Sequence, residues 1–138
     1  MPAGQRRRAV LLVEDDAVLQ GALARFLELS GFGVVAVATA DEALAAWRTR
    51  DLDGAIVDLH LGQGSGRDVV VAIPQPAPVI IFSGAPEESC QLERLRPRTR
   101  LVPKPHSLVL LIDTLKGMLS AQSGSAQAAP PCQSRPAR

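Results

Sequence analysis

Apolar residues in this 138-residue chain follow two alternating patterns, short continuous runs and longer stripes at helical spacing. Continuous runs are typical of strands that are covered on both faces of a sheet. The stripes repeat every three or four residues and indicate helices with one buried side. Strand and helix alternate five times, which predicts an α/β fold, a doubly wound five-stranded parallel sheet with helices on both faces. The predicted strands are residues 9–13, 34–37, 55–57, 79–82 and 101–102.

The first two helices carry clear start and stop signals. Asp16 is placed to cap the first helix and Gly31 to end it. Thr39 and Glu42 have the spacing of a capping box, with Thr39 at the cap and Glu42 reaching back. The buried side of the first helix is predicted to hold Leu19, Ala22, Leu23, Phe26 and Leu27. The buried side of the second is predicted to hold Ala43, Leu44 and Trp47.

Proline limits the third and fourth helices. Residues 66–73 hold only about two helical turns before a series of prolines begins at Pro74. Residues 87–95 can form a fourth helix, which Pro97 stops. The last helix, residues 107–119, has an apolar face made of Leu108, Leu111, Ile112, Leu115 and Leu119.

One domain is expected, over residues 9–119, because a chain of this length can bury a sizeable core. Residues 1–8 form a polar lead-in that carries three arginines. Residues 120–138 contain no valine, leucine, isoleucine, methionine or aromatic residue. They are predicted to be a disordered tail, because they have little apolar surface to bury.

Charge and composition exclude several classes of partner. A net charge of +1 offers no electrostatic reason to bind nucleic acid or a membrane. The chain has no tyrosine, which argues against a base-stacking surface. No apolar run approaches the ~20 residues that span a bilayer, and residues 1–8 lack the apolar core of a signal peptide. Cys90 and Cys132 match no metal spacing, so a reduced, cytoplasmic location is the simplest interpretation.

Polar residues follow four of the five predicted strands. Glu14 and Asp15 end the first, Asp58 the third, Ser83 the fourth and Lys104 the fifth. Ligands of open parallel sheets bind beyond the carboxyl ends of the strands, and right-handed crossovers place the first and third strands side by side. We therefore expect the three carboxylates to form one acidic cluster.

A cluster of three carboxylates requires a compensating charge, and Mg²⁺ is the hard, oxygen-binding cation that suits it. The Lys104 ammonium and the Ser83 hydroxyl would suit an incoming phosphoryl group. Each residue alone has an ordinary alternative: Asp15 or Asp16 could cap a helix, Ser83 could form a turn and Lys104 could be a solvated charge. Together the strand ends favour a site that moves a phosphoryl group onto Asp58.

These residues resemble the receiver domain of two-component response regulators, a stand-alone, single-domain type in this chain. The resemblance spans about residues 9–119 and rests on four segments in order: Val13-Glu14-Asp15-Asp16, Val57-Asp58-Leu59-His60-Leu61, Phe82-Ser83-Gly84 and Val102-Pro103-Lys104-Pro105. It implies a flavodoxin-like sheet of strand order 2-1-3-4-5. It also implies a partner, a sensor histidine kinase or histidine phosphotransfer protein, that supplies the phosphoryl group.

By this resemblance Asp58 is the phosphoacceptor, and Ser83 and Lys104 bind phosphoryl oxygens. Glu14, Asp15 and Asp58 hold Mg²⁺ together with the backbone carbonyl of His60. The chain is then a signalling phosphoacceptor rather than an enzyme, and its downstream protein target is not identified by the sequence. The Lys104–Pro105 bond is expected to be cis.

Two other functions remain open at this stage. One is a phosphohydrolase that forms an aspartyl phosphate, although such enzymes usually carry a second acid where this chain has His60. The other is a degenerate receiver that acts as a scaffold, against which the complete acidic set argues. The family often has an aromatic switch residue where this chain has Leu101, which has no ring to move toward Ser83.

The last helix also predicts an exposed apolar pair. Leu110 lies roughly opposite Leu108 by the ~100° step of a helix, so it should be exposed and Val109 partly so. A single exposed leucine is ordinary on a protein surface. The alternative is that the pair belongs to a partner or homodimer surface on the last two helices.

Overall fold

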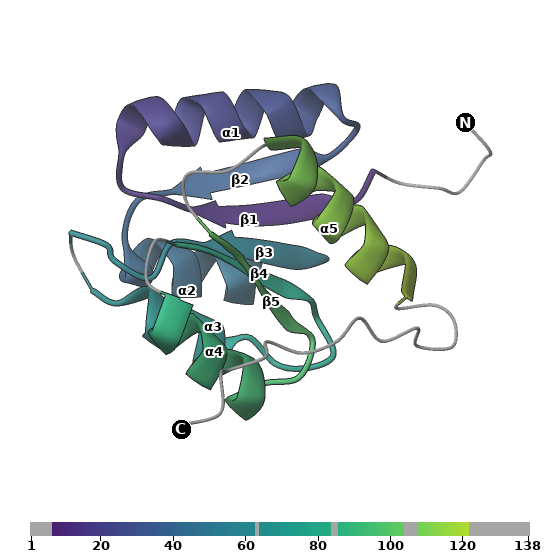
Figure 1. Cartoon of the computed structure of the whole chain (residues 1–138). Helices are drawn as coiled ribbons and strands as arrows, with labels where there is room; N and C mark the ends of the chain where they lie inside the picture. The colour runs from purple at the N-terminus through teal and green to yellow at the C-terminus, as the bar shows by residue number, and fades with distance from the viewer. Residues whose placement is uncertain (1–6, 63, 84–85, 104–107, 122–138) are drawn as a thin grey trace.

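The computed structural model describes residues 7–62, 64–83, 86–103 and 108–121, and Figure 1 shows their arrangement. Five parallel strands form one sheet in the order β2-β1-β3-β4-β5, which confirms the predicted fold and strand order. The strands are β1 (Ala9–Val13), β2 (Gly33–Val37), β3 (Gly54–Val57), β4 (Val79–Ser83) and β5 (Thr99–Pro103). The edge strand β5 is therefore longer than the predicted residues 101–102.

Helices cover both faces of the sheet (Figure 1). They are α1 (Ala17–Leu29), α2 (Ala40–Thr49), α3 (Gly66–Ala72), α4 (Pro86–Leu95) and α5 (Leu108–Ala121). Helices α1 and α5 pack on one face, and α2, α3 and α4 on the other. None of the described helices is long and apolar enough to cross a membrane.

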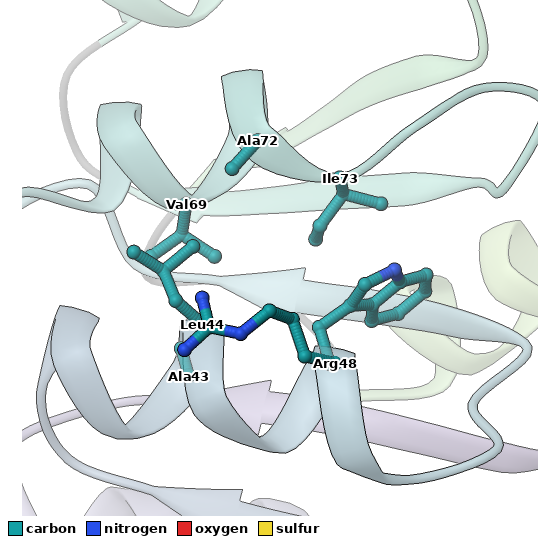
Figure 2. Close-up of a pocket in the computed structure, with 7 residues that line it drawn as sticks. Ala43, Leu44, Arg48, Val69, Ala72 and Ile73 are labelled. Carbon is teal, nitrogen blue, oxygen red and sulfur yellow. The ribbon is translucent and has the colours of Figure 1, made fainter.

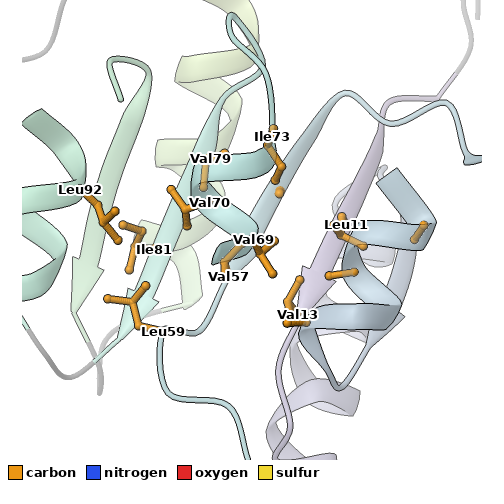
Figure 3. Close-up of a cluster of buried hydrophobic side chains, with 14 residues drawn as sticks. Leu11, Val13, Val57, Leu59, Val69, Val70, Ile73, Val79, Ile81 and Leu92 are labelled. Atoms are coloured by element: carbon orange, nitrogen blue, oxygen red, sulfur yellow. The ribbon is translucent and has the colours of Figure 1, made fainter. Parts of the chain in front are cut away.

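The sheet separates two apolar cores, because successive side chains of a strand point to opposite faces. In β1, Val10 and Leu12 face the core under α1 and α5. Leu11 and Val13 face the core under α2, α3 and α4, which Figure 3 shows. All four side chains are fully buried. Burial on both faces explains why the central strands β1, β3 and β4 are continuous apolar runs.

Helix α1 begins and ends as predicted. The Asp16 carboxylate accepts hydrogen bonds from the backbone N–H groups of Val18 and Leu19, at 3.0 and 3.2 Å. Gly31 follows the C-cap with φ of 102°, a left-handed conformation that favours glycine.

Helix α2 differs from the prediction in two details. Thr39 Oγ1 accepts from Glu42 N–H at 3.2 Å, but the Glu42 carboxylate accepts from Ala38 N–H, one residue before the cap. Three alanines form the buried side of α2: Ala40, Ala43 and Ala46. Leu44 and Trp47, which were predicted to be buried, are only partly buried.

The described chain ends later than the predicted domain boundary. Helix α5 runs to Ala121, two residues beyond Leu119. Val109 and Leu110 are both exposed, and Val109 is the more exposed of the two, at 58% against 40%. The Lys104–Pro105 bond lies outside the described residues, whose one cis peptide bond is Gln75–Pro76.

A buried arginine holds the turn that follows the short helix α3. Arg96 is 5% exposed, and its guanidinium donates to the carbonyl oxygens of Ile73, Pro74 and Ala77 at 2.9, 3.1 and 2.6 Å. It also donates to Thr99 Oγ1 at 3.2 Å. Burial, assisted by the charge of Arg98, lowers the pKa of Arg96 to about 10, so the group is still charged at neutral pH.

Candidate functional site

Three predicted acidic residues meet at the carboxyl edge of the sheet. Glu14 and Asp15 directly follow β1, and Asp58 directly follows β3. Val13 and Val57 pair in register, so the two strands deliver these residues to the same place. A carboxylate oxygen from each of Glu14, Asp15 and Asp58 lies within 4.8 Å of the other two.

The backbone at the cluster continues the hydrogen-bond pattern of the sheet. Asp58 N–H donates to the Val13 carbonyl at 2.9 Å, and Glu14 N–H donates to the Val37 carbonyl at 3.1 Å. Glu14 and Asp58 are 2% and 7% exposed, whereas Asp15 is exposed. The cluster is therefore a mostly enclosed site that is open to solvent on the Asp15 side.

Each carboxylate is oriented by a backbone N–H group. Glu14 Oε2 accepts from Asp16 at 3.2 Å, and Asp58 Oδ1 accepts from His60 at 3.1 Å. Asp15 Oδ2 accepts from Gly62 at 2.8 Å, which ties the loop after β3 to the loop after β1. Charge-assisted bonds of this kind fix side-chain orientation more firmly than bonds between neutral groups.

Helix α3 begins against the backbone of Asp58. Gly66 N–H donates to the Leu59 carbonyl at 3.2 Å, and Ser65 Oγ caps the helix by accepting from Arg67 N–H at 3.1 Å. A Cβ atom at Gly66 would collide with the carbonyl oxygen of Asp58. Only glycine permits this approach, and the contact fixes the path of the chain as it leaves the site.

The donor set of the cluster suits a hard divalent cation. All three side chains offer carboxylate oxygens, the ligands that Mg²⁺ prefers, and only part of its shell needs to come from protein. Three ionised carboxylates at this separation repel one another, and a bound dication would offset that repulsion.

Two predicted site residues fall partly or wholly outside the described part of the chain. Ser83 is the last residue of β4 and pairs with Pro103 of β5, but its side chain is not among the described ones. Lys104 lies outside the described residues altogether. The side chain of His60 is exposed. The roles of Ser83, Lys104 and the His60 carbonyl therefore stay predictions.

Sequence reasoning missed Gln20, a polar residue in the first turns of α1. The side-chain nitrogen of Gln20 donates to the carbonyl oxygens of Glu14 and Val37, both at 2.9 Å. The sequence signal that could have revealed this role is the position of Gln20 in the helix. Gln20 lies one turn after the cap residue Asp16, and helical side chains point back toward the start of their helix.

Glu93 of α4 was also missed. It is 8% exposed, and its Oε2 accepts from the backbone N–H of Leu101 at 2.7 Å. This bond joins α4 to the edge strand at the position where the family often has an aromatic switch residue. No sequence signal reveals it, because it depends on how α4 docks against β5.

A separate shallow groove lies between α2 and α3, with a volume of about 140 Å³ (Figure 2). Leu44 and Arg48 border it from α2, and Val69, Ala72 and Ile73 from α3. None of the three clustered carboxylates lines it.

Comparison with known protein families identifies one match over most of the chain. The family model described as "Response regulator receiver domain" matches residues 10–116. Acid tolerance regulatory protein ActR of Sinorhizobium medicae (strain WSM419) is 41% identical over 66 residues, which cover 48% of this chain and 34% of that protein. Regulatory protein VirG of Agrobacterium tumefaciens (strain 15955) is 32% identical over 83 residues, 59% of this chain and 31% of that protein. These alignments span roughly a third of each relative's length.

Solved structures agree with the family match. A response regulator receiver protein from Sinorhizobium medicae WSM419 superposes with a TM-score of 0.79 at 25% identity, covering 85% of this chain and 98% of that one. A response regulator receiver domain protein (CheY-like) from Methanospirillum hungatei JF-1 gives a TM-score of 0.80 at 24% identity, covering 86% and 98%. The second likeness shows the fold alone.

Proposed function

The chain belongs to the response regulator receiver domain family of two-component systems, and on this premise we propose that Asp58 is its phosphoacceptor. The partner would be a sensor histidine kinase or a histidine phosphotransfer protein that carries the phosphoryl group on histidine. The observation that carries the proposal is the meeting of Glu14, Asp15 and Asp58 oxygens within 4.8 Å at the carboxyl edge of the sheet.

In the proposed step, a carboxylate oxygen of Asp58 attacks the phosphorus of the phosphohistidine. An O–P bond forms as the N–P bond breaks, and the imidazole leaves with the bonding electron pair and is protonated by solvent. Asp58 is suited to this role because His60 N–H already holds one of its oxygens, at 3.1 Å. The site opens to solvent on the Asp15 side, where a partner could enter.

The cluster would hold Mg²⁺ through Glu14, Asp15 and Asp58, with the His60 carbonyl as a further ligand. Bound Mg²⁺ would offset the negative charges of the carboxylates and of the phosphoryl group. Ser83 and Lys104 would bind phosphoryl oxygens. The pairing of Ser83 with Pro103, the residue directly before Lys104, supports a shared location at the end of β4 and β5.

Two observations favour a signalling role over the alternatives. Position 60 is histidine, and an aspartyl-phosphate hydrolase usually has its second acid there. A degenerate scaffold would not need three carboxylates that are each oriented by a backbone N–H group. Phosphorylation adds charge and strong acceptors at the strand ends, and we infer that it changes contacts with a downstream protein in the cytoplasm.

Mass spectrometry tests the assignment of Asp58. The protein is incubated with Mg²⁺ and acetyl phosphate, and wild type should gain the mass of one phosphoryl group. Asp58→Asn should gain none, and Asp68→Asn, a matched change at an exposed position on α3, should behave as wild type. A mass gain that persists in Asp58→Asn would refute the assignment, and steady turnover of phosphomonoesters would favour a hydrolase.

Dimerisation through the last two helices is a second proposal. Val109 and Leu110 form an exposed apolar pair at the start of α5, 58% and 40% exposed. Apolar pairs on a receiver surface would suit self-association or a protein target. The proposed domain is residues 9–119, to which α5 adds Ser120 and Ala121, and the rest of residues 120–138 would form a tail outside it.

A further inference from the structure

Gln20 links the ends of two strands to the first turn of α1. Its side-chain nitrogen has two N–H groups and two acceptors, the carbonyls of Glu14 and Val37, both at 2.9 Å. Gln20 is itself fixed in the helix, because its backbone N–H donates to the Asp16 carbonyl at 2.8 Å. The side chain is half-buried, so it spans from the surface to the edge of the sheet.

The Glu14 backbone is held on both sides by this arrangement. Its N–H donates to the Val37 carbonyl at 3.1 Å, and its own carbonyl accepts from Gln20. That carbonyl belongs to the planar peptide unit that joins Glu14 to Asp15. Fixing the orientation of this one unit therefore fixes the Cα positions of two of the three acidic residues.

We propose that Gln20 is a positioning residue that sets the metal affinity of the acidic cluster. The inference rests on the proposed function, since it concerns the residues assigned to hold Mg²⁺. Gln20 contacts none of the three carboxylates through the bonds described, and it acts through the backbone. An amide supplies two donors without adding charge beside the cluster, so the negative potential that attracts a cation is preserved.

Replacing Gln20 by methionine keeps the length and helix propensity of the side chain and removes both donors. Groups that orient metal ligands typically contribute 10- to 100-fold in affinity, so the Mg²⁺ dissociation constant should rise by at least about tenfold. The rate of Asp58 phosphorylation should fall at low Mg²⁺ and recover at saturating Mg²⁺. Gln91→Met is the matched control, because it makes the same change at an exposed position on α4.

Calorimetric titration with Mg²⁺ and the melting temperature without metal separate positioning from general stability. Gln20→Met should remain folded without metal, with a somewhat lower melting temperature because two carbonyls lose a donor, and it should bind Mg²⁺ more weakly. Gln91→Met should match wild type in both. Equal Mg²⁺ affinity in Gln20→Met and wild type would overturn the inference and leave the proposed function intact. A wild type that neither binds Mg²⁺ nor gains a phosphoryl group would overturn both.

A measurement on the unaltered protein covers the case in which Gln20→Met does not fold. The side-chain NH₂ protons of Gln20 should exchange with water far more slowly than those of Gln91 in amide NMR spectra. The chemical shifts of these protons should also change when Mg²⁺ is added, because one of the two carbonyls they bind belongs to Glu14, which is assigned to hold the metal. Exchange as fast as that of Gln91, with no response to Mg²⁺, would refute the proposal.

Discussion

Gly66→Ala tests how closely the phosphoacceptor depends on the helix that follows it. Gly66 opens α3 in contact with the backbone of the Asp58 segment. An added Cβ would collide with the Asp58 carbonyl oxygen and would lie 2.8 Å from the Asp58 carbonyl carbon and 2.7 Å from Leu59 Cα. All three neighbours are backbone atoms, so no flexible side chain can move away to relieve the contact.

The size of the movement that Gly66→Ala requires sets the expected loss of stability and of phosphorylation rate. Ordinary Cβ contacts begin at 3.4 Å, so the contact with Leu59 Cα alone requires α3 and the Asp58 segment to separate by about 0.7 Å, and the collision with the Asp58 carbonyl oxygen requires more. Overpacking of this kind usually costs about 1–3 kcal/mol of stability. Misplacement of a reacting group by about 1 Å can reduce a rate by about 100-fold, so phosphorylation of Asp58 should slow by about 10- to 100-fold.

Gly21→Ala is the matched control. Gly21 lies on the exposed side of α1, and a Cβ there would meet nothing within 4 Å. Since alanine is a better helix former than glycine, this variant should gain about 0.5–1 kcal/mol. Urea unfolding, followed through the fluorescence of the single tryptophan Trp47, measures both stabilities. Mass spectrometry with acetyl phosphate measures the two phosphorylation rates.

The prediction requires the stabilities of the two alanine variants to change in opposite directions relative to wild type. If Gly66→Ala were as stable as wild type and gained a phosphoryl group at the same rate, the close contact between α3 and Asp58 would not constrain the site. A loss of stability with an unchanged rate would show that α3 alone yields and that the Asp58 segment keeps its position.

Two further variants test the structure away from the cluster. Arg96→Met should cost about 3 kcal/mol in urea unfolding, because several enclosed carbonyls lose their donors, whereas exposed Arg67→Met should cost less than about 0.5 kcal/mol. Because the pKa of Arg96 is lowered to about 10 in the folded state, its ionisation makes stability depend on pH, rising with pH, only above about pH 10. The difference in unfolding free energy between Arg96→Met and wild type should therefore be constant between about pH 6 and 8. A marked change in that range would refute the reasoning. Leu110→Glu should reduce self-association of the phosphorylated protein in sedimentation velocity while Lys116→Glu, exposed on the same helix, should not. No difference between them would remove the dimer surface.

Periodicity was sufficient to predict the sheet and the place of the acidic cluster. Continuous apolar runs located the central strands β1, β3 and β4, because a strand buried on both faces has no polar position to interrupt it. The edge strand β5 begins with Thr99 and Arg100 and was predicted too short. The polar residue at the end of a run then marks the carboxyl edge of the sheet. Glu14 and Asp58 came together because Val13 and Val57 pair in register, a consequence of strand order alone.

The contacts that hold the cluster and the turn after α3 in place could not be predicted in the same way. Gln20, Gly66 and Arg96 act on backbone atoms of other elements, and such contacts have no period in the sequence. Gly66 permits a close approach of two backbone segments, whereas Gln20 and Arg96 donate to backbone carbonyls. Carbonyls at strand and helix ends lack partners within their own element, and a buried carbonyl without a donor is costly. Once a fold is known, these end groups show where positioning residues must lie.

Position 101 illustrates the consequence for signalling. Leu101 has no ring to swing toward Ser83, but its backbone N–H is bonded to the enclosed carboxylate of Glu93 at 2.7 Å. Any movement of β5 at this residue must stretch that bond or carry α4 with it. Since β5 is the edge strand and α4 packs against it, this bond is a direct backbone link between the two elements. We therefore infer that any coupling between β5 and α4 at position 101 depends on the Glu93 carboxylate and not on the side chain of Leu101.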